Sequence, residues 1–141
     1  MMNLSRFEPY ARSILRFVTG LLFTCHGLQK LIGAFGGIDG HGGGIPFGTL
    51  AWFAGILEAI GGPLIMLGLF TQPVAFILCG EMAVAYFRAH APRAFMPVRS
   101  GGELAVLYCF IFLYLFTAGS GPISLDRYLR RFRKPSGPRS A

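Results

Sequence analysis

The sequence predicts an all-α membrane protein, built as a four-helix transmembrane bundle with a short C-terminal amphipathic interfacial helix. Of the 141 residues, 53% are hydrophobic and only 13% are charged, whereas soluble domains carry about 25% charged residues. Four apolar runs are each long enough to cross a hydrocarbon core of ~30 Å, which takes ~17–25 residues. Three of the six acidic residues lie inside these runs or at their ends, which indicates an ionisable interior.

The expected spans cover residues 13–35, 47–70, 73–90 and 102–118. Residues 36–46 join the first two spans and are too rich in glycine for regular structure. A tight connection joins the second span to the third, with Pro73 at a favoured helix start. Pro92 and Pro97 bracket the loop before the fourth span.

The residues after the fourth span predict a basic amphipathic helix at the membrane surface. Leu125, Tyr128, Leu129 and Phe132 follow one another at positions i, i+3, i+4 and i+7, and arginines lie between them. Anionic lipids are the partner that such a helix favours. The chain therefore divides into an N-terminal cytoplasmic segment (1–12), a four-span domain (13–121) and a basic cytoplasmic tail with the amphipathic helix (122–141).

The net charge of +7 reflects membrane topology rather than nucleic-acid binding. Nine of the thirteen basic residues lie at the two ends of the chain, and four lie in the loops and span ends on the opposite face. Cytoplasmic segments carry the excess of lysine and arginine. An even number of spans places both termini on one side, so we expect both in the cytoplasm.

The three cysteines, Cys25, Cys79 and Cys109, all lie inside apolar runs, and no Cys-x-x-Cys motif occurs. This pattern excludes a secreted disulfide framework and argues against a dithiol relay of the usual kind. We expect buried cysteines that act as small hydrophobic residues.

Ionisable residues inside the spans are the candidates for function. A carboxylate at the bilayer centre costs about 2.5–3.5 kcal/mol on insertion scales, and such residues are commonly functional. Glu58 and Glu81 fall near the middle of their spans, and His26 and Lys30 share one face of the first span. His90, Arg99 and Glu103 gather at the outer ends of the spans, so these residues outline an outward-facing polar cavity.

Two interpretations of this interior remain open. In the structural one, Lys30 pairs with a glutamate and fixes the register of the bundle. In the functional one, the carboxylates and imidazoles bind a polar ligand or relay protons. The Asp39-Gly-His41 segment offers only two ligands on a glycine-rich loop, so no metal site is predicted.

Several motifs occur in an order and spacing that resemble the DoxX family. Residues 25–31, Cys-His-Gly-Leu-Gln-Lys-Leu, followed by two glycines, resemble the signature of its first helix. Residues 55–62, Gly-Ile-Leu-Glu-Ala-Ile-Gly-Gly, and the following Leu-Gly-Leu-Phe-Thr look like its second helix. Residues 90–97, 101–103 and 124–126 are similar to the remainder, so the resemblance extends over about residues 12 to 130.

The resemblance implies a bacterial inner-membrane protein that carries the label of oxidoreductase. Related domains occur in archaeal thiosulfate:quinone oxidoreductase, which suggests quinone as a ligand and other membrane redox subunits as partners. On this interpretation, proton transfer and ligand charge fall to His26, Lys30, Glu58 and His90, and ligand binding falls to Glu103. Glu81 and Arg99 join the ligand-binding residues on their positions in the sequence alone, since the resemblance does not extend to them. The alternatives are a small transporter or channel-like subunit and a structural partner of membrane redox enzymes.

Overall fold

The computed structural model describes residues 4–133, and all regular structure within them is helical. The predicted all-α class is therefore confirmed, while residues 134–141 of the predicted tail lie outside the described part. In chain order the elements are η1 (Ser5–Phe7), α1 (Glu8–Ile32), η2 (Ala34–Gly36), α2 (Leu50–Leu67), α3 (Thr71–Ala85), η3 (Tyr86–His90), α4 (Pro97–Ser100), α5 (Glu103–Ala118) and α6 (Leu125–Arg133).

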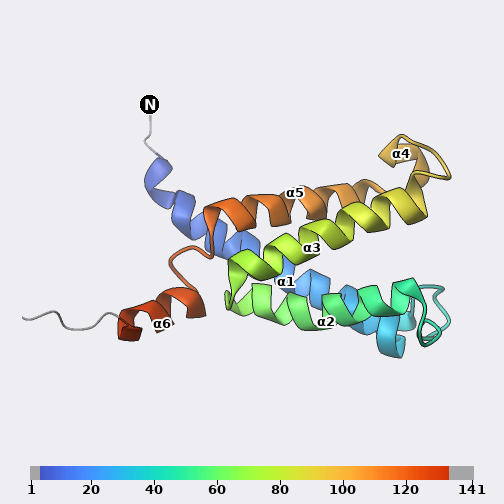
Figure 1. Cartoon of the computed structure of the whole chain (residues 1–141), viewed down its shortest axis with the longest axis horizontal. Coiled ribbons are helices and arrows are strands. Elements are labelled where there is room, and N and C mark those ends of the chain that lie inside the picture. Colours follow the sequence, from blue (N-terminus) through green and yellow to red (C-terminus); the bar gives the residue numbers. More distant parts are fainter. Residues whose placement is uncertain (1–3, 134–141) are drawn as a thin grey trace, which may run out of the picture.

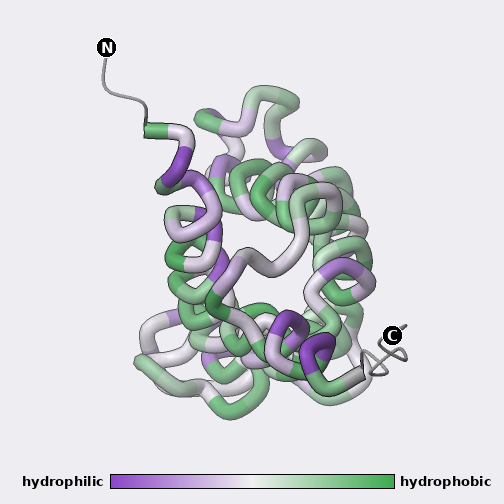
Figure 2. Tube along the Cα trace, turned by 90° about the vertical axis from the view of Figure 1, so that its left-hand side faces the viewer, coloured by the Kyte–Doolittle hydropathy of each residue, from purple (hydrophilic) through white to green (hydrophobic). Residues whose placement is uncertain are grey.

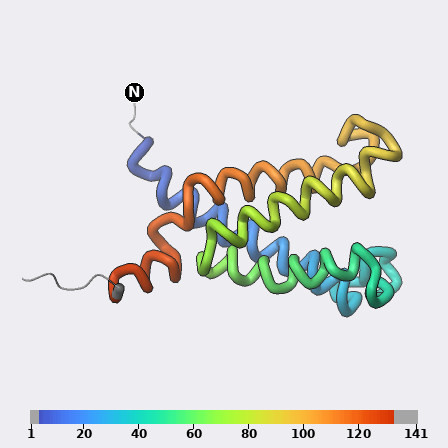
Figure 3. Tube along the Cα trace, viewed as in Figure 1, coloured from blue at the N-terminus to red at the C-terminus, as the bar shows by residue number. Residues whose placement is uncertain are grey.

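The four long helices pack as two pairs. Helix α1 lies along α2, α3 lies along α5, and the contact between α2 and α3 joins the pairs. In the view of Figure 1 the pairs meet at the end of the bundle near α6 and diverge toward the end that carries α4. The chain trace in Figure 3 shows a short turn between α2 and α3 and a longer connection, through η3 and α4, between α3 and α5.

Glycines allow α1 and α2 to approach closely. A Cβ atom on Gly20 would lie 2.3 Å from the backbone nitrogen of Met66, and one on Gly27 would lie 2.3 Å from that of Ala59. Small residues at such a contact let two backbones pack directly, as helix pairs in membranes commonly do. The α1–α2 pair is thus set by backbone contact rather than by large side chains.

Most residues of the long helices are apolar, as the hydropathy colours in Figure 2 show in the view along the bundle. The largest fully buried apolar side chains are few, namely Phe23, Ile65, Leu78, Phe112 and Leu115. Many other large apolar side chains are exposed on all four long helices, more than a soluble monomer usually carries. Within residues 4–133, α2 is the one helix that meets both the length and the hydropathy expected of a membrane span, and α5 is apolar but shorter.

Most helix boundaries differ from the ends of the predicted spans by one to five residues. Helix α1 begins at Glu8 rather than at residue 13, because Pro9 stands in the first turn, where its missing N–H costs nothing. The third span ends as an α-helix at Ala85 and continues as a π-helical turn, η3, to His90. A π-helical turn widens the helix, and such turns are frequent at functional sites.

Arg16 closes the end of the bundle near α6. Its side chain is only 3% exposed. The guanidinium donates hydrogen bonds to four carbonyl oxygens, those of Ile65, Met66, Ser120 and Ile123. It therefore satisfies the carboxyl end of α2 and ties it to the α5–α6 connection. The sequence pattern places Arg16 only among the basic residues that determine topology, because its carbonyl partners lie far away in the chain.

Helix α6 is anchored by Asp126. Its carboxylate accepts hydrogen bonds from the backbone N–H groups of Phe70 (2.8 Å) and Thr71 (2.9 Å), which begin α3. The Asp126 N–H in turn donates to the carbonyl oxygen of Gly68 (2.9 Å). From this anchor α6 extends away from the end of the bundle (Figure 1), with the side chains of its apolar stripe, Leu125, Tyr128, Leu129 and Phe132, exposed.

Candidate functional site

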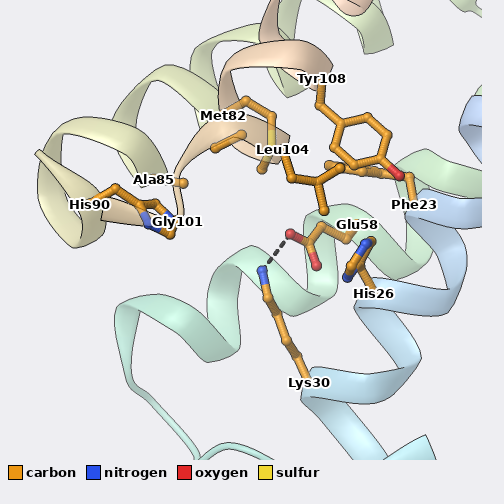
Figure 4. A pocket seen from close by; sticks show the side chains of 11 residues that line it. Phe23, His26, Lys30, Glu58, Met82, Ala85, His90, Gly101, Leu104 and Tyr108 are labelled. Carbon is orange, nitrogen blue, oxygen red and sulfur yellow. Dashed lines mark hydrogen bonds and ion pairs between the residues drawn. The ribbon is translucent and has the colours of Figure 1, made fainter. Parts of the chain in front are cut away.

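A cavity of about 210 Å³ lies between the two helix pairs. Side chains of α1, α2, α3, η3 and α5 line it, together with the turn before α5 (Figure 4). The lining residues are Phe23, His26, Lys30, Glu58, Met82, Ala85, His90, Gly101, Leu104, Ala105 and Tyr108. The cavity thus combines an apolar wall with four ionisable side chains that the sequence analysis singled out.

An ion pair between Lys30 and Glu58 forms the polar side of the cavity (Figure 4). The Lys30 ammonium donates to Oε1 of Glu58. Glu58 is 2% exposed and Lys30 is 21% exposed, so the carboxylate is the deeper partner. Gly55 lies one turn before Glu58 on α2, and a Cβ there would be 3.0 Å from Cβ of Lys30. The glycine therefore leaves room for the lysine side chain beside α2.

The second carboxylate oxygen of Glu58 is available to a ligand. Oε2 is buried and accepts no hydrogen bond from any group within residues 4–133. Figure 4 shows the carboxylate between the Lys30 ammonium and the His26 ring. A buried carboxylate oxygen without a donor is costly, so this atom can accept a hydrogen bond from any molecule in the cavity that carries an N–H or O–H group.

His26 and Tyr108 bring two aromatic rings with polar atoms to the same place. His26 lies one turn before Lys30 on α1, as the i, i+4 spacing predicted, and its ring meets the Tyr108 ring edge-on at 6.0 Å between centroids. Tyr108 comes from α5 and also packs edge-on against Phe23 (5.1 Å). Tyr108 is not among the site residues predicted from the sequence, because one tyrosine in an apolar run has the pattern of an ordinary core residue.

His90 reaches the cavity from the π-helical turn η3. Its Nδ1 lies 3.1 Å from the carbonyl oxygen of Ser100, which can only accept, so Nδ1 is the donor. Gly102 packs against this histidine, since a Cβ there would be 2.8 Å from Cβ of His90. The Gly101-Gly102 pair and the π-helical turn together place the imidazole at the cavity.

The other three predicted site residues do not line the cavity. Arg99 in α4 and Glu103 at the start of α5 are exposed, at the end of the bundle where the pairs diverge. Glu81 on α3 is half-buried, and neither of its carboxylate oxygens has a hydrogen-bond donor among the described residues. The charges of Glu58 and Lys30 nevertheless act on Glu81, which places it near the ion pair.

Two of the cysteines meet across the α3–α5 contact. The Sγ atoms of Cys79 and Cys109 are 3.7 Å apart, whereas Cys25 on α1 has no such partner in the described residues. The two positions are thirty residues apart in the sequence, so no spacing motif could reveal the pair. Both thiols are free in this structure.

The glycine-rich connection between α1 and α2 folds back onto the end of α1. The Ile45 N–H donates to the carbonyl oxygen of Lys30 (2.7 Å), and the Gln29 side chain donates to that of Gly37 (2.8 Å). Asp39 accepts a hydrogen bond from the His41 N–H (3.0 Å) in a local turn. Within residues 4–133, no group of three or more His, Cys, Asp or Glu side chains could hold a metal ion.

Residues 11–91, more than half of the chain, match the sequence pattern that defines the DoxX family. The chain belongs to the DoxX family. The matched region contains most of α1 and all of α2 and α3, and it includes His26, Lys30, Glu58 and His90. The resemblance noted from the sequence is thereby confirmed, although the fourth helix lies outside the matched range.

Three bacterial proteins resemble the chain over most of their length. An uncharacterized protein of Haemophilus influenzae is 40% identical over 129 residues, which cover 89% of this chain and 96% of the relative. A Bacillus subtilis protein named "Putative oxidoreductase CatD" is 30% identical over 122 residues, which cover 86% of this chain and 88% of the relative. An uncharacterized membrane protein of Mycobacterium tuberculosis is 30% identical over 145 aligned positions, which cover 89% of this chain and 85% of the relative. No solved structure matches the chain.

These similarities make the chain a membrane protein of the DoxX family. The exposed apolar side chains agree with that conclusion, because lipid covers them at no cost.

Proposed function

We propose that this DoxX-family protein crosses the bacterial inner membrane four times, with both termini in the cytoplasm. Helices α1, α2 and α5 and the combined α3–η3 segment (residues 71–90) would be the spans. At 1.5 Å per residue a helix of twenty residues is about 30 Å long, which suits the hydrocarbon core. The distribution of basic residues, nine against four, supports the orientation.

We further propose that the cavity binds a quinone-like ring or a similar small polar molecule in a redox-associated role. The observation that carries this proposal is the unpaired Oε2 of Glu58, which lies in a cavity walled by Phe23, Leu104 and Tyr108. A cavity of about 150 Å³ can hold a benzene ring, so 210 Å³ accommodates one substituted ring. The name of the Bacillus subtilis relative supports an oxidoreductase.

The side chains around the cavity have distinct roles in this proposal. Lys30 stabilises negative charge on the ligand, and His26 or His90 exchanges protons with it. Glu58 accepts a hydrogen bond from a ligand hydroxyl at Oε2 and passes protons inward, with Glu81 assisting. Reduction of a quinone takes up two electrons and two protons. The chain supplies the proton path, while other membrane redox subunits are the proposed source of the electrons.

Binding of a short-chain ubiquinone analogue and of its quinol to the purified protein tests the proposal. We expect Glu58→Gln to weaken quinol binding on the order of tenfold, since one charge-assisted hydrogen bond contributes about 1.5–3 kcal/mol. Tyr108→Phe serves as a second, milder variant in the same cavity. His41→Ala is the matched control, because His41 lies in the connection between α1 and α2, away from the cavity. Equal binding by all these proteins would contradict the proposal.

A second candidate function is a pathway for protons or small ions. It is favoured by Glu81, whose two buried oxygens lack donors among the described residues and which lies within the electrostatic reach of Glu58. Such unpaired carboxylates inside a membrane commonly mark transport pathways. Flux in proteoliposomes that Glu81→Gln abolishes, and that needs no redox partner, would favour this function over the first.

A further inference from the structure

A second cleft, of about 420 Å³, lies near α6, and it shares no lining residue with the cavity that holds Glu58. Arg12 of α1 lines one side, Gln72 of α3 another, and Arg127 and Arg130 of α6 a third, with residues 118–122 between them. None of the lining residues is acidic. Three arginines from distant parts of the chain therefore converge on one polar cleft.

Hydrogen bonds hold Arg12 in place, and no acidic residue lines the cleft beside the three arginines. Arg12 donates to the carbonyl oxygen of Ala118 and, at 3.1 Å, to the carboxylate of Glu8, which does not line the cleft. The Nε of Arg12 is buried and has no acceptor among the described residues. Arg127 and Arg130 lie three residues apart on one face of α6, and neither forms a salt bridge within residues 4–133. A buried donor without an acceptor, beside two unpaired cations, calls for an anion.

An apolar surface formed by α3 and α5 lies beside the cleft. The Gln72 side chain donates to the carbonyl oxygen of Phe116 (3.0 Å), which joins the polar cleft to α5. Phe76 lies one turn after Gln72 on α3, and its ring is 5.2 Å from that of Phe116. Phe76 is 60% exposed and Phe116 is 36% exposed. The two rings therefore offer an apolar track that starts at the cleft.

We propose that this cleft binds the phosphate of an anionic membrane lipid. The arginines hold the phosphodiester, and an acyl chain lies along Phe76 and Phe116. Basic pockets between transmembrane helices are known to select anionic headgroups. The apolar track favours a lipid over a soluble phosphate, because a free anion has no acyl chain that could contact the two rings.

Native mass spectrometry of the full-length, delipidated protein in neutral detergent tests this site. Dioleoylphosphatidylglycerol should bind more tightly than dioleoylphosphatidylcholine, which has the same chains and no net charge. The Arg127→Gln/Arg130→Gln variant should bind phosphatidylglycerol roughly tenfold more weakly. The Arg88→Gln/Arg93→Gln variant loses the same charge at exposed residues outside both the cleft and α6, and should keep wild-type binding.

A third comparison distinguishes the contribution of the acyl chain to binding from that of the phosphate headgroup. Phe76→Ala should weaken phosphatidylglycerol binding, whereas Phe87→Ala, at an equally exposed phenylalanine outside the cleft, should not. Glycerol phosphate should compete only weakly with the lipid. Equal losses in the two double-arginine variants, equal binding of the two lipids, or competition by glycerol phosphate at the lipid's own affinity would each overturn the proposal.

Discussion

Lys30 of α1 and Glu58 of α2 form an ion pair whose carboxylate is 2% exposed and whose ammonium borders a cavity. The pair joins the two helices that pack most closely through glycines. Burial of both charges is costly, and breaking such a pair leaves one charge uncompensated. Packing and the proposed ligand binding therefore depend on the same two side chains.

We expect the Lys30→Met and Glu58→Gln variants to be destabilised by about 3 kcal/mol each. The double variant should recover much of that loss, because no lone charge remains in the interior. Thermal unfolding in detergent measures the three variants. Glu8→Gln breaks the more exposed Arg12–Glu8 pair and serves as the control, with an expected loss below about 1 kcal/mol. Strictly additive losses at Lys30 and Glu58 would show that the two side chains do not interact.

The close α1–α2 contact predicts a sharp difference between two glycine substitutions. Gly27→Ala would place a methyl group 2.3 Å from the backbone nitrogen of Ala59, so the helices must separate. We expect a loss of about 1–3 kcal/mol or more, as for other overpacked cores. Gly80→Ala on α3 meets open space within 4 Å and should be neutral or slightly stabilising. Similar unfolding temperatures for the two variants would contradict the packing described here.

The sequence was sufficient for the helices and for part of the site. Apolar runs located the long helices, and the i, i+4 spacing correctly placed His26 beside Lys30. The sequence predicted that Lys30 pairs with a glutamate but did not show which one. That choice depends on the register between α1 and α2, which backbone contacts at glycines such as Gly27 determine. The roles of Arg16 and Tyr108 could not be predicted from the sequence. They depend on carbonyl groups and aromatic rings from segments far away in the chain.

The Cys79–Cys109 contact predicts a specific cross-link. With Sγ atoms 3.7 Å apart, mild oxidation by diamide should join α3 to α5 within one chain, since a disulfide needs only a small approach of the two sulfurs. Mass spectrometry should find a linked peptide pair and a loss of two hydrogens. Cys79→Ser should abolish the link, and Cys25→Ser should leave it intact. A link that involves Cys25 instead would mean that α3 and α5 are not paired in this register.

The proposed orientation predicts the location of both ends of the chain. Reporter fusions at either terminus should be active only in the cytoplasm, because the basic residues concentrate at these ends. A fusion within residues 36–46 should report the opposite side. A periplasmic signal from the C-terminal fusion would end the four-span proposal with both termini inside.

Asp126 should control both the start of α3 and the position of α6. Its carboxylate accepts from two α3 amides, so Asp126→Ala should cost about 1–2 kcal/mol, as the loss of a helix N-cap does. Asp126→Asn keeps one acceptor oxygen and should lose less. Asp39→Ala removes a comparable side chain-to-backbone bond in an exposed loop and should change stability little. Because α6 would also lose its anchor, trypsin should cleave after Arg127 and Arg130 faster in Asp126→Ala than in Asp39→Ala. Equal cleavage of these two variants would show that α6 is held by contacts other than Asp126.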